Sequence, residues 1–252
     1  MTALARDLAR LGLSAGARVL VHAALRGTGL RAEELAAALR RALGPEGTLV
    51  VPAFTPENSA GSRAHLARVA GLDPAGARAF RARMPAFDPA RTPGHGTGVF
   101  AERIRTAPGA ARSEHPQSSF AALGRDAERI CADHAWNCHL GEKSPLGTLG
   151  REGGQVLMIN VGFDACTAFH LAEYRVPSPE TRTYCCVVGL PEGDRWIGYR
   201  DIALDDTDFA RIGAAIPPRL VRDGRLGSAG ARLFPIAGAV AHAVAWMTEN
   251  RR

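Results

Sequence analysis

The sequence predicts an α/β protein built as three α/β/α layers around a mostly parallel central sheet. Continuous apolar runs at residues 18–22, 48–54 and 154–161 are typical of strands that are buried on both faces. A helical pattern at residues 32–43 separates the first two runs, and this strand–helix–strand order favours parallel pairing. The length of 252 residues fits a single domain spanning residues 1–252.

The elements follow in chain order from apolar spacing and from the residues that end them. A helix at residues 2–12 has leucines at helical spacing and ends at a glycine, and the helix at 32–43 ends at a Gly-Pro pair. On the same grounds we expect short strands at 119–123 and 231–235. We expect a helix after the first of these strands, to about residue 134, and another that begins near residue 167. Further helices are expected at 98–106, 206–215 and 238–247.

Two regions depart from this regular alternation. Apolar runs at residues 183–188 and 195–199 flank a Pro-Glu-Gly-Asp turn, which predicts an antiparallel hairpin in the C-terminal third. Residues 55–95 are interrupted by proline and glycine, and we expect an irregular segment with one short helical piece around residues 65–70. A segment this long and irregular inside a domain is typical of a lid over a binding site.

The composition excludes several classes of protein. The net charge is +6, but the basic residues are mostly scattered arginines and aromatic residues make up only 6%, so a nucleic-acid-binding stripe is not expected. No run approaches the roughly 18 apolar residues of a membrane span, and the first residues do not resemble a signal peptide. Five cysteines without a CxxC pair indicate reduced thiols, so we expect a cytoplasmic protein.

The most informative stretch is residues 160–174, where a buried strand ends at a glycine and a helix begins. Thr167, His170 and Glu173 recur every three residues and therefore share one helical face. A His–carboxylate pair can accept a proton from an amine, with the carboxylate fixing the imidazole tautomer. The Thr167 hydroxyl or nearby backbone N–H groups could stabilise the oxyanion of acyl transfer.

Other readings of these residues stay open on spacing alone. The His170–Glu173 spacing also fits a surface ion pair or part of a zinc hydrolase site, although a third zinc ligand is not evident. Cys166 lies four residues before His170 and would suit a thioesterase with a covalent acyl-cysteine. Cys131, His134 and Cys138 would form an inward stripe if they lie on one helix, and core packing is favoured there over a metal site.

A series of motifs in order is more specific than any one of them. The motifs are VHAALRGTG at 21–29, GTLVVPAFT at 47–55, RTP at 91–93, GVFAE at 98–102, PGAARSEHP at 108–116, SPLG at 144–147 and TAFHLAE at 167–173. Together they resemble the aminoglycoside 3-N-acetyltransferase family over residues 3–248. The resemblance implies acetyl transfer from acetyl-CoA on an α/β fold distinct from the GNAT acetyltransferases, with no metal.

The resemblance also implies roles for individual residues. His170 and Glu173 match the catalytic pair, and we add Thr167 as a polarising group. The positions expected to approach the coenzyme are Ala23, Ala24, Leu25, Arg26, Gly27, Thr28, Arg91, Gly98, Val99 and Phe100. Glycine-bearing turns suit this task because backbone N–H groups can approach phosphates and amides closely. The residues expected on the acceptor side are Glu57, Asp73, His115 and Asp164.

Two departures from the family pattern bear on these roles. Ala23 and Ala24 stand where the family usually has serines, so coenzyme contacts there must come from the backbone, and a non-catalytic coenzyme-binding relative is a further alternative. In residues 55–95 the acidic residues are outnumbered by arginines, whereas polycationic aminoglycosides favour carboxylates. The acceptor is therefore expected to be an amine of an aminoglycoside or of a related, less basic natural product. A homodimer is compatible with the sequence.

Overall fold

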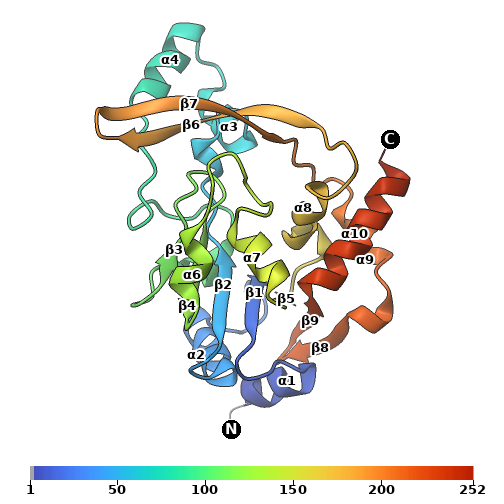
Figure 1. The fold of residues 1–252 in the computed structure, drawn as a ribbon. Helices are drawn as coiled ribbons and strands as arrows, with labels where there is room; N and C mark the ends of the chain where they lie inside the picture. The colour runs from blue at the N-terminus through green and yellow to red at the C-terminus, as the bar shows by residue number, and fades with distance from the viewer. Residues whose placement is uncertain (1–2, 252) are drawn as a thin grey trace.

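A computed structural model of the protein describes residues 3–251 and contains a central sheet of seven strands in the order β3-β4-β2-β1-β5-β9-β8 (Figure 1). Its centre is β2 (Thr48–Pro52), β1 (Arg18–Ala23) and β5 (Gln155–Ile159), which pair in parallel. These are the three continuous apolar runs of the sequence, and nearly all of their residues are buried. The predicted parallel centre and α/β class are confirmed.

The outer pairings of the sheet are antiparallel. On one side β4 (Phe120–Gly124) pairs with β2, and β3 (Ala111–Arg112) pairs with β4. On the other side β9 (Ala229–Pro235) pairs with β5, and β8 (Arg222–Leu226) pairs with β9. The strands β4 and β9 were expected from apolar runs, whereas β3 and β8 were not.

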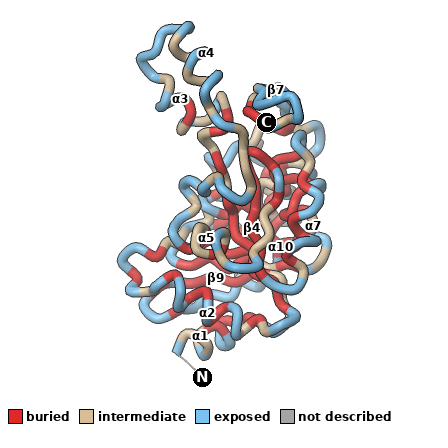
Figure 2. Tube along the Cα trace, turned by 90° about the vertical axis from the view of Figure 1, so that its left-hand side faces the viewer, coloured by how far each residue is buried: buried red, intermediate tan, exposed pale blue. Residues whose placement is uncertain are grey.

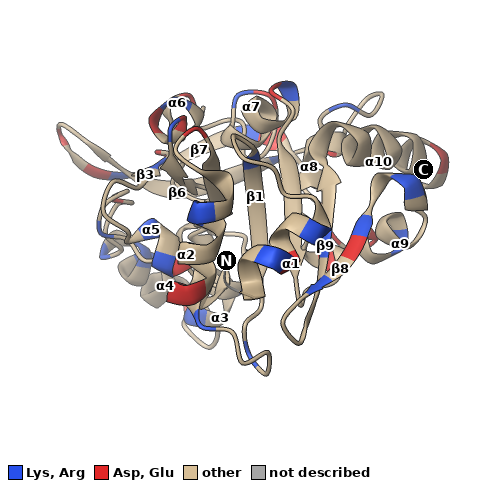
Figure 3. Cartoon of the chain, turned by 90° about the horizontal axis from the view of Figure 1, so that it is seen from below, with Lys and Arg blue, Asp and Glu red and all other residues tan. Residues whose placement is uncertain are grey.

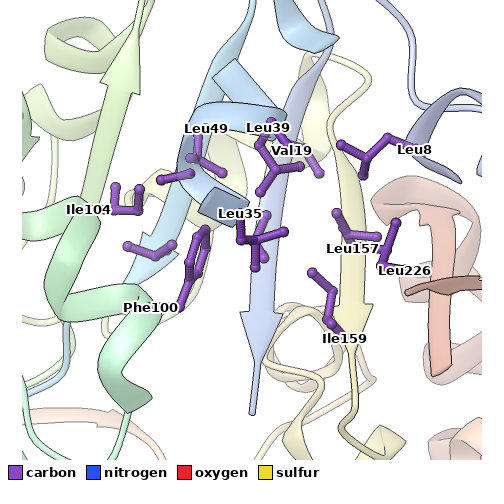
Figure 4. Close-up of a cluster of buried hydrophobic side chains, with 14 of the residues drawn as sticks. Leu8, Val19, Leu35, Leu39, Leu49, Phe100, Ile104, Leu157, Ile159 and Leu226 are labelled. Carbon is purple, nitrogen blue, oxygen red and sulfur yellow. The ribbon is translucent and has the colours of Figure 1, made fainter. Parts of the chain in front are cut away.

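Helices cover both faces of the sheet, as predicted. One face carries α1 (Ala3–Leu11), α2 (Ala32–Leu43) and α5 (Gly98–Arg105), whose leucines, Phe100 and Ile104 pack onto alternate strand residues (Figure 4). The other face carries α6 (Ala127–Ala132), α7 (Pro145–Arg151), α8 (Ala168–Glu173), α9 (Phe209–Ala214) and α10 (Ile236–Asn250). Alternation along each strand sends successive side chains to the two cores, so Val19 and Val21 face the first core and Leu20 the second.

The predicted hairpin is present and longer than expected. The strands β6 (Thr181–Leu190) and β7 (Gly193–Ile202) form a separate two-stranded antiparallel sheet. Together with α3 (Arg63–Val69) and α4 (Pro74–Ala82), the hairpin lies at the end of the molecule opposite the N-terminus (Figure 1). The indole N–H of Trp196 donates to the Arg81 carbonyl at 2.9 Å, which ties α4 to the hairpin.

Three local features differ in detail from the sequence-based expectation. Residues 55–95 are less irregular than predicted, because α4 begins with Asp73 as its N-cap and proline in its first turn; Figure 2 shows α3 and α4 projecting from the body with little buried surface. The helix expected to reach residue 134 ends at Ala132, so Cys131, His134 and Cys138 share no helix, although all three are buried. The helix α7 was missed because it is short and contains two glycines.

Surface charge is distributed over the whole molecule. Figure 3 shows arginines and acidic residues mixed on the helices, loops and outer strands, while β1 at the centre is largely uncharged. In the part of the chain that the structure describes, no helix has the length and hydropathy needed to cross a membrane.

Candidate active site

A cleft of about 400 Å³ opens at the carboxyl ends of β1, β2 and β5. This is where open α/β sheets usually place their binding residues. Segments far apart in the sequence line it, and they include six of the residues expected at a site: Ala23, Ala24, Gly98, Asp164, Thr167 and His170. Asp206 and Phe209, which were not predicted, line it as well. The cleft therefore collects the end of β1, the start of α5 and the face of α8.

The predicted pair forms on α8. The Nδ1 atom of His170 lies 2.7 Å from Oε2 of Glu173. The Glu173 side chain is 3% exposed and that of His170 is 15% exposed, so this is not a surface ion pair. An ionised carboxylate can only accept, so Nδ1 carries the proton and Nε2 keeps its lone pair. Within residues 3–251 no protein group is hydrogen-bonded to Nε2, which leaves it available to a ligand.

Glu173 has partners that the sequence did not predict. Its second oxygen, Oε1, accepts hydrogen bonds from the Asp205 backbone N–H at 3.0 Å and from the Arg251 guanidinium at 2.6 Å. Because both oxygens are engaged, the carboxylate is held in one orientation towards His170. The separation of 78 residues between Glu173 and Arg251 explains why no local sequence pattern indicated the contact.

Thr167 lies at the N-terminus of the same helix, α8. It occupies the N-cap position of α8 but has helical backbone angles, and its side chain caps no helix amide. Since the residue also lines the cleft, its hydroxyl can be directed to a ligand. The three residues predicted from helical spacing thus lie together, with Thr167 and His170 facing the cleft and Glu173 behind them.

The turn that follows β1, from Ala23 to Gly29, is held by Asn160, a side chain for which the sequence predicted no role. Asn160, at the end of β5, has a φ of 52° and donates from Nδ2 to the Ala24 carbonyl at 2.8 Å. Gly98 begins α5 with a φ of +85°, and a Cβ there would lie 3.2 Å from the Ala23 carbonyl oxygen. Thr97 makes no side-chain cap to α5, so the first amides of that helix remain available beside the cleft.

The residues present fit a coenzyme with phosphate and amide groups. The start of an eight-residue helix without a side-chain cap suits an anion, and the Ala23 and Ala24 side chains are short enough for backbone contact. His22 on the same wall is 8% exposed, and its Nε2 has no hydrogen-bond partner within the described range 3–251. Burial lowers the pKa of His22 to about 4, so its imidazole is neutral at pH 7.

Other residues predicted for the coenzyme do not line this cleft. Leu25 and Phe100 are buried in the core, and the Thr28 hydroxyl bonds the Leu25 carbonyl within its own loop. Four others are exposed to solvent: Arg26, Gly27, Arg91 and Val99. The Arg91 side chain is 89% exposed and lies beside Asp88.

Three residues predicted for the acceptor side also lie elsewhere. Glu57 faces Arg68 and His95, and Asp73 caps α4 by accepting from the Gly76 N–H. His115 is fully buried, and its Nδ1 accepts from the backbone N–H groups of residues 117 and 118. These contacts lie within residues 55–95 and in the loop before β4.

A second His–carboxylate pair lies in the interior beneath the hairpin. The Nδ1 atom of His139 is 2.6 Å from Oδ2 of Asp201, and the same oxygen accepts from the Tyr174 hydroxyl at 2.8 Å. On the other side of the ring, Nε2 lies 2.9 Å from Oε1 of Gln117. Burial lowers the pKa of His139, although Asp201 opposes this shift. His139 does not line the cleft.

The structure gives little support for the two alternative chemistries, a cysteine nucleophile and a metal site. The Cys166 side chain is fully buried, and burial raises the pKa of its thiol to about 12, so the thiolate is scarce at neutral pH. Between residues 3 and 251 no group of three or more His, Cys, Asp or Glu side chains is arranged to hold a metal ion.

The three-layer α/β fold holds a His–Glu pair and a threonine hydroxyl at one cleft, an arrangement that can move a proton during group transfer. The family model for aminoglycoside 3-N-acetyltransferases matches residues 20–248, and the chain belongs to this family of acyltransferases. Aminoglycoside N(3)-acetyltransferase VII of Streptomyces paromomycinus is 34% identical, with 99% of this chain and 91% of that protein covered.

Solved structures agree with this assignment. The crystal structure of YokD from Bacillus subtilis has a TM-score of 0.90 and 32% identity, and the match covers 98% of each chain. A structure of AAC-IIIb in a binary complex with CoASH has a TM-score of 0.84 and 31% identity over 98% of this chain and 95% of that one. The fold predicted from the sequence is therefore the fold of this family.

Proposed function

We propose that this protein transfers acetyl directly from acetyl-CoA to an amine of an aminoglycoside or related natural product, with His170 as the general base. The observation that carries the proposal is the His170–Glu173 pair, which lies at the cleft with the Nε2 lone pair uncommitted. Membership of an acetyltransferase family supports the reaction class. The complex of AAC-IIIb with coenzyme A supports the donor.

The donor side of the cleft would be formed by the end of β1 and the start of α5. Acetyl-CoA supplies an activated acetyl group as a co-substrate. The short Ala23 and Ala24 side chains let the backbone approach it, and the amides that open α5 can donate to its polar groups. Thr167, whose hydroxyl serves no helix cap, can donate to the acetyl carbonyl oxygen.

The acceptor side requires a neutral amine at the moment of attack. The exposed carboxylates of Asp164 and Asp206 line the cleft and attract a cationic amine. After the ammonium form has released one proton to solvent, His170 takes a second proton from the neutral amine through Nε2 as the C–N bond forms, and returns it to the sulfur as the C–S bond breaks. Glu173 stabilises the transient imidazolium, and such a base contributes on the order of 100- to 10,000-fold.

Release of free coenzyme A thiol tests this function. Purified protein is mixed with acetyl-CoA and a panel of amines that includes aminoglycosides and less cationic natural products, and the acetylated product is identified by mass. We expect amine-dependent thiol release that is strongly reduced in His170→Ala and Glu173→Ala. Unchanged turnover in both variants would remove the base mechanism. Coenzyme A binding without release across the panel would favour a non-catalytic relative.

A further inference from the structure

Arg251 connects the C-terminal end of α10 to the His170–Glu173 pair. It follows α10 directly, and its backbone N–H donates to the Met247 carbonyl at 2.8 Å. Its guanidinium reaches Oε1 of Glu173 through Nη1 at 2.6 Å. The Nε and Nη2 atoms bond the two oxygens of Asp208 at 2.7 and 2.6 Å, and Nη2 also reaches the Asp205 carbonyl.

A buried carboxylate needs this kind of partner. The Glu173 side chain is 3% exposed, and an ionised carboxylate out of water is costly unless it is paired and hydrogen-bonded. Arg251 occupies Oε1, which leaves Oε2 to accept from His170. Burial alone would lower the pKa of Arg251, but its bonds to Asp208 and Glu173 outweigh this and raise it, so the guanidinium stays charged.

The fork of the guanidinium matters as well as its charge. Asp208 holds Nε and one terminal nitrogen, and only a planar group with a further nitrogen can reach Glu173 from the same position. A lysine at this position has a single ammonium and cannot satisfy both carboxylates with that geometry.

We propose that Arg251 is a positioning residue of the transfer reaction: anchored by Asp208, it fixes the ionised Glu173 carboxylate and, through it, the tautomer and orientation of His170. This proposal rests on the function proposed above. Arg251 bonds Glu173, and Glu173 in turn bonds the His170 ring. Arg251 therefore acts on His170 through Glu173 and not by direct contact. It also makes the end of α10 part of the catalytic apparatus.

The first test compares Arg251→Gln with Arg175→Gln. Arg175 is a matched control because it lies two residues after Glu173 and is ion-paired with Glu142, with no contact to Glu173. We expect Arg251→Gln to lower kcat by on the order of 10- to 100-fold, by analogy with the loss typical when the hydrogen-bond partner that orients a metal-bound histidine is removed. Arg251→Lys should fall between wild type and Arg251→Gln. Equal activity in Arg251→Gln and Arg175→Gln would overturn the proposal.

The pH profile separates positioning from a merely structural role. The charged or titratable groups around the pair are Arg251, Asp205, Asp208 and His139, together with Asp164 and Asp206, which line the same cleft as His170. Losing the positive charge of Arg251 makes both the neighbouring carboxylate and the imidazole easier to protonate. The acidic limb of kcat/KM against pH therefore moves to higher pH in Arg251→Gln. A loss of amplitude with an unmoved limb would show a structural role only and would also overturn the proposal.

A readout that needs no turnover keeps this inference distinct from the proposed function. The ¹⁵N and ¹H resonances of the His170 ring report its tautomer and its titration in the resting protein. We expect a fixed Nδ1–H tautomer in wild type and Arg175→Gln, and averaging of the two tautomers in Arg251→Gln. If no amine is acetylated but this difference is seen, the proposed function fails and the positioning role stands. Identical ring spectra in all three proteins would refute the role.

Discussion

The molecule contains two His–carboxylate pairs with nearly the same contact geometry and different surroundings. The Nδ1–oxygen distance is 2.7 Å in the His170–Glu173 pair and 2.6 Å in the His139–Asp201 pair. The Nε2 atom of His139 is bonded to Gln117, whereas the Nε2 atom of His170 has no partner among residues 3–251. In addition, His170 lines a cleft and His139 does not. A short His–carboxylate contact alone therefore does not distinguish a catalytic base from an interior pair; the open second nitrogen and the place at the cleft are what favour His170 in our proposal.

The interior His139–Asp201 pair should stabilise the fold. Asp201→Ala removes the acceptor of the His139 ring, the His139 backbone N–H and the Tyr174 hydroxyl. We expect a loss of about 3–5 kcal/mol in the free energy of unfolding, because buried donors lose their partner together. Denaturant unfolding measures this. Asp223→Ala, which breaks an exposed pair with Arg232, should cost under about 1 kcal/mol, and similar losses in both would contradict a structural role for the interior pair.

Acid should weaken the fold through the buried histidines. Burial lowers the pKa of His22 and His134 to about 4 and lowers those of His115 and His139, whereas the unfolded chain binds these protons near pH 6.5. Stability is therefore complete above about pH 6.5 and falls as pH drops towards 4. By pH 5, His22 and His134 should each account for about 2 kcal/mol.

The measurement is the free energy of unfolding at pH 7 and pH 5 for wild type and His22→Leu. The variant should lose part of the difference between the two pH values. His95→Gln is the matched control, because it removes an exposed histidine (62% side-chain exposure) in place of a buried one. An equal pH dependence in wild type and His22→Leu would show that His22 protonates as easily in the folded protein.

A smaller effect is expected on the donor side of the cleft. Gly98→Ala must hold alanine at a φ of +85° and place its Cβ 3.2 Å from the Ala23 carbonyl oxygen. Gly109→Ala carries similar backbone strain at a φ of +78° with nothing within 4 Å of its Cβ. Both should lose about 1–2 kcal/mol of stability, but only Gly98→Ala should raise the KM for acetyl-CoA. An unchanged KM in Gly98→Ala would separate the start of α5 from coenzyme binding.

The smallest effect is expected at Cys166. Its thiol is fully buried and burial raises its pKa to about 12, so we expect too little thiolate at neutral pH for it to act as a nucleophile. Cys166→Ala should keep kcat within a few-fold of wild type, and no acetyl group should be found on the protein by intact mass after exposure to acetyl-CoA alone. A stable mass increase that disappears in the variant would favour the thioesterase reading.

The sequence predicted what depends on neighbouring residues. The central strands could be found because they are continuous apolar runs, and Thr167, His170 and Glu173 could be grouped because one helix turn brings them together. The strand β8 was missed because four of its five residues are exposed and one of them is glycine, so it has no apolar run. Arg251 lies 78 residues from Glu173 and Asp201 lies 62 from His139, distances at which only the folded chain establishes a contact.

The most direct test measures kcat/KM for coenzyme A release in His170→Gln and His139→Gln side by side, at a temperature where circular dichroism shows both to be folded. His170→Gln should lose on the order of 100- to 10,000-fold, because the amine loses its base. His139→Gln should stay within a few-fold per folded molecule, because its ring contacts only the interior. Equal losses in the two variants, or full activity in His170→Gln, would contradict the assignment of His170 as the base.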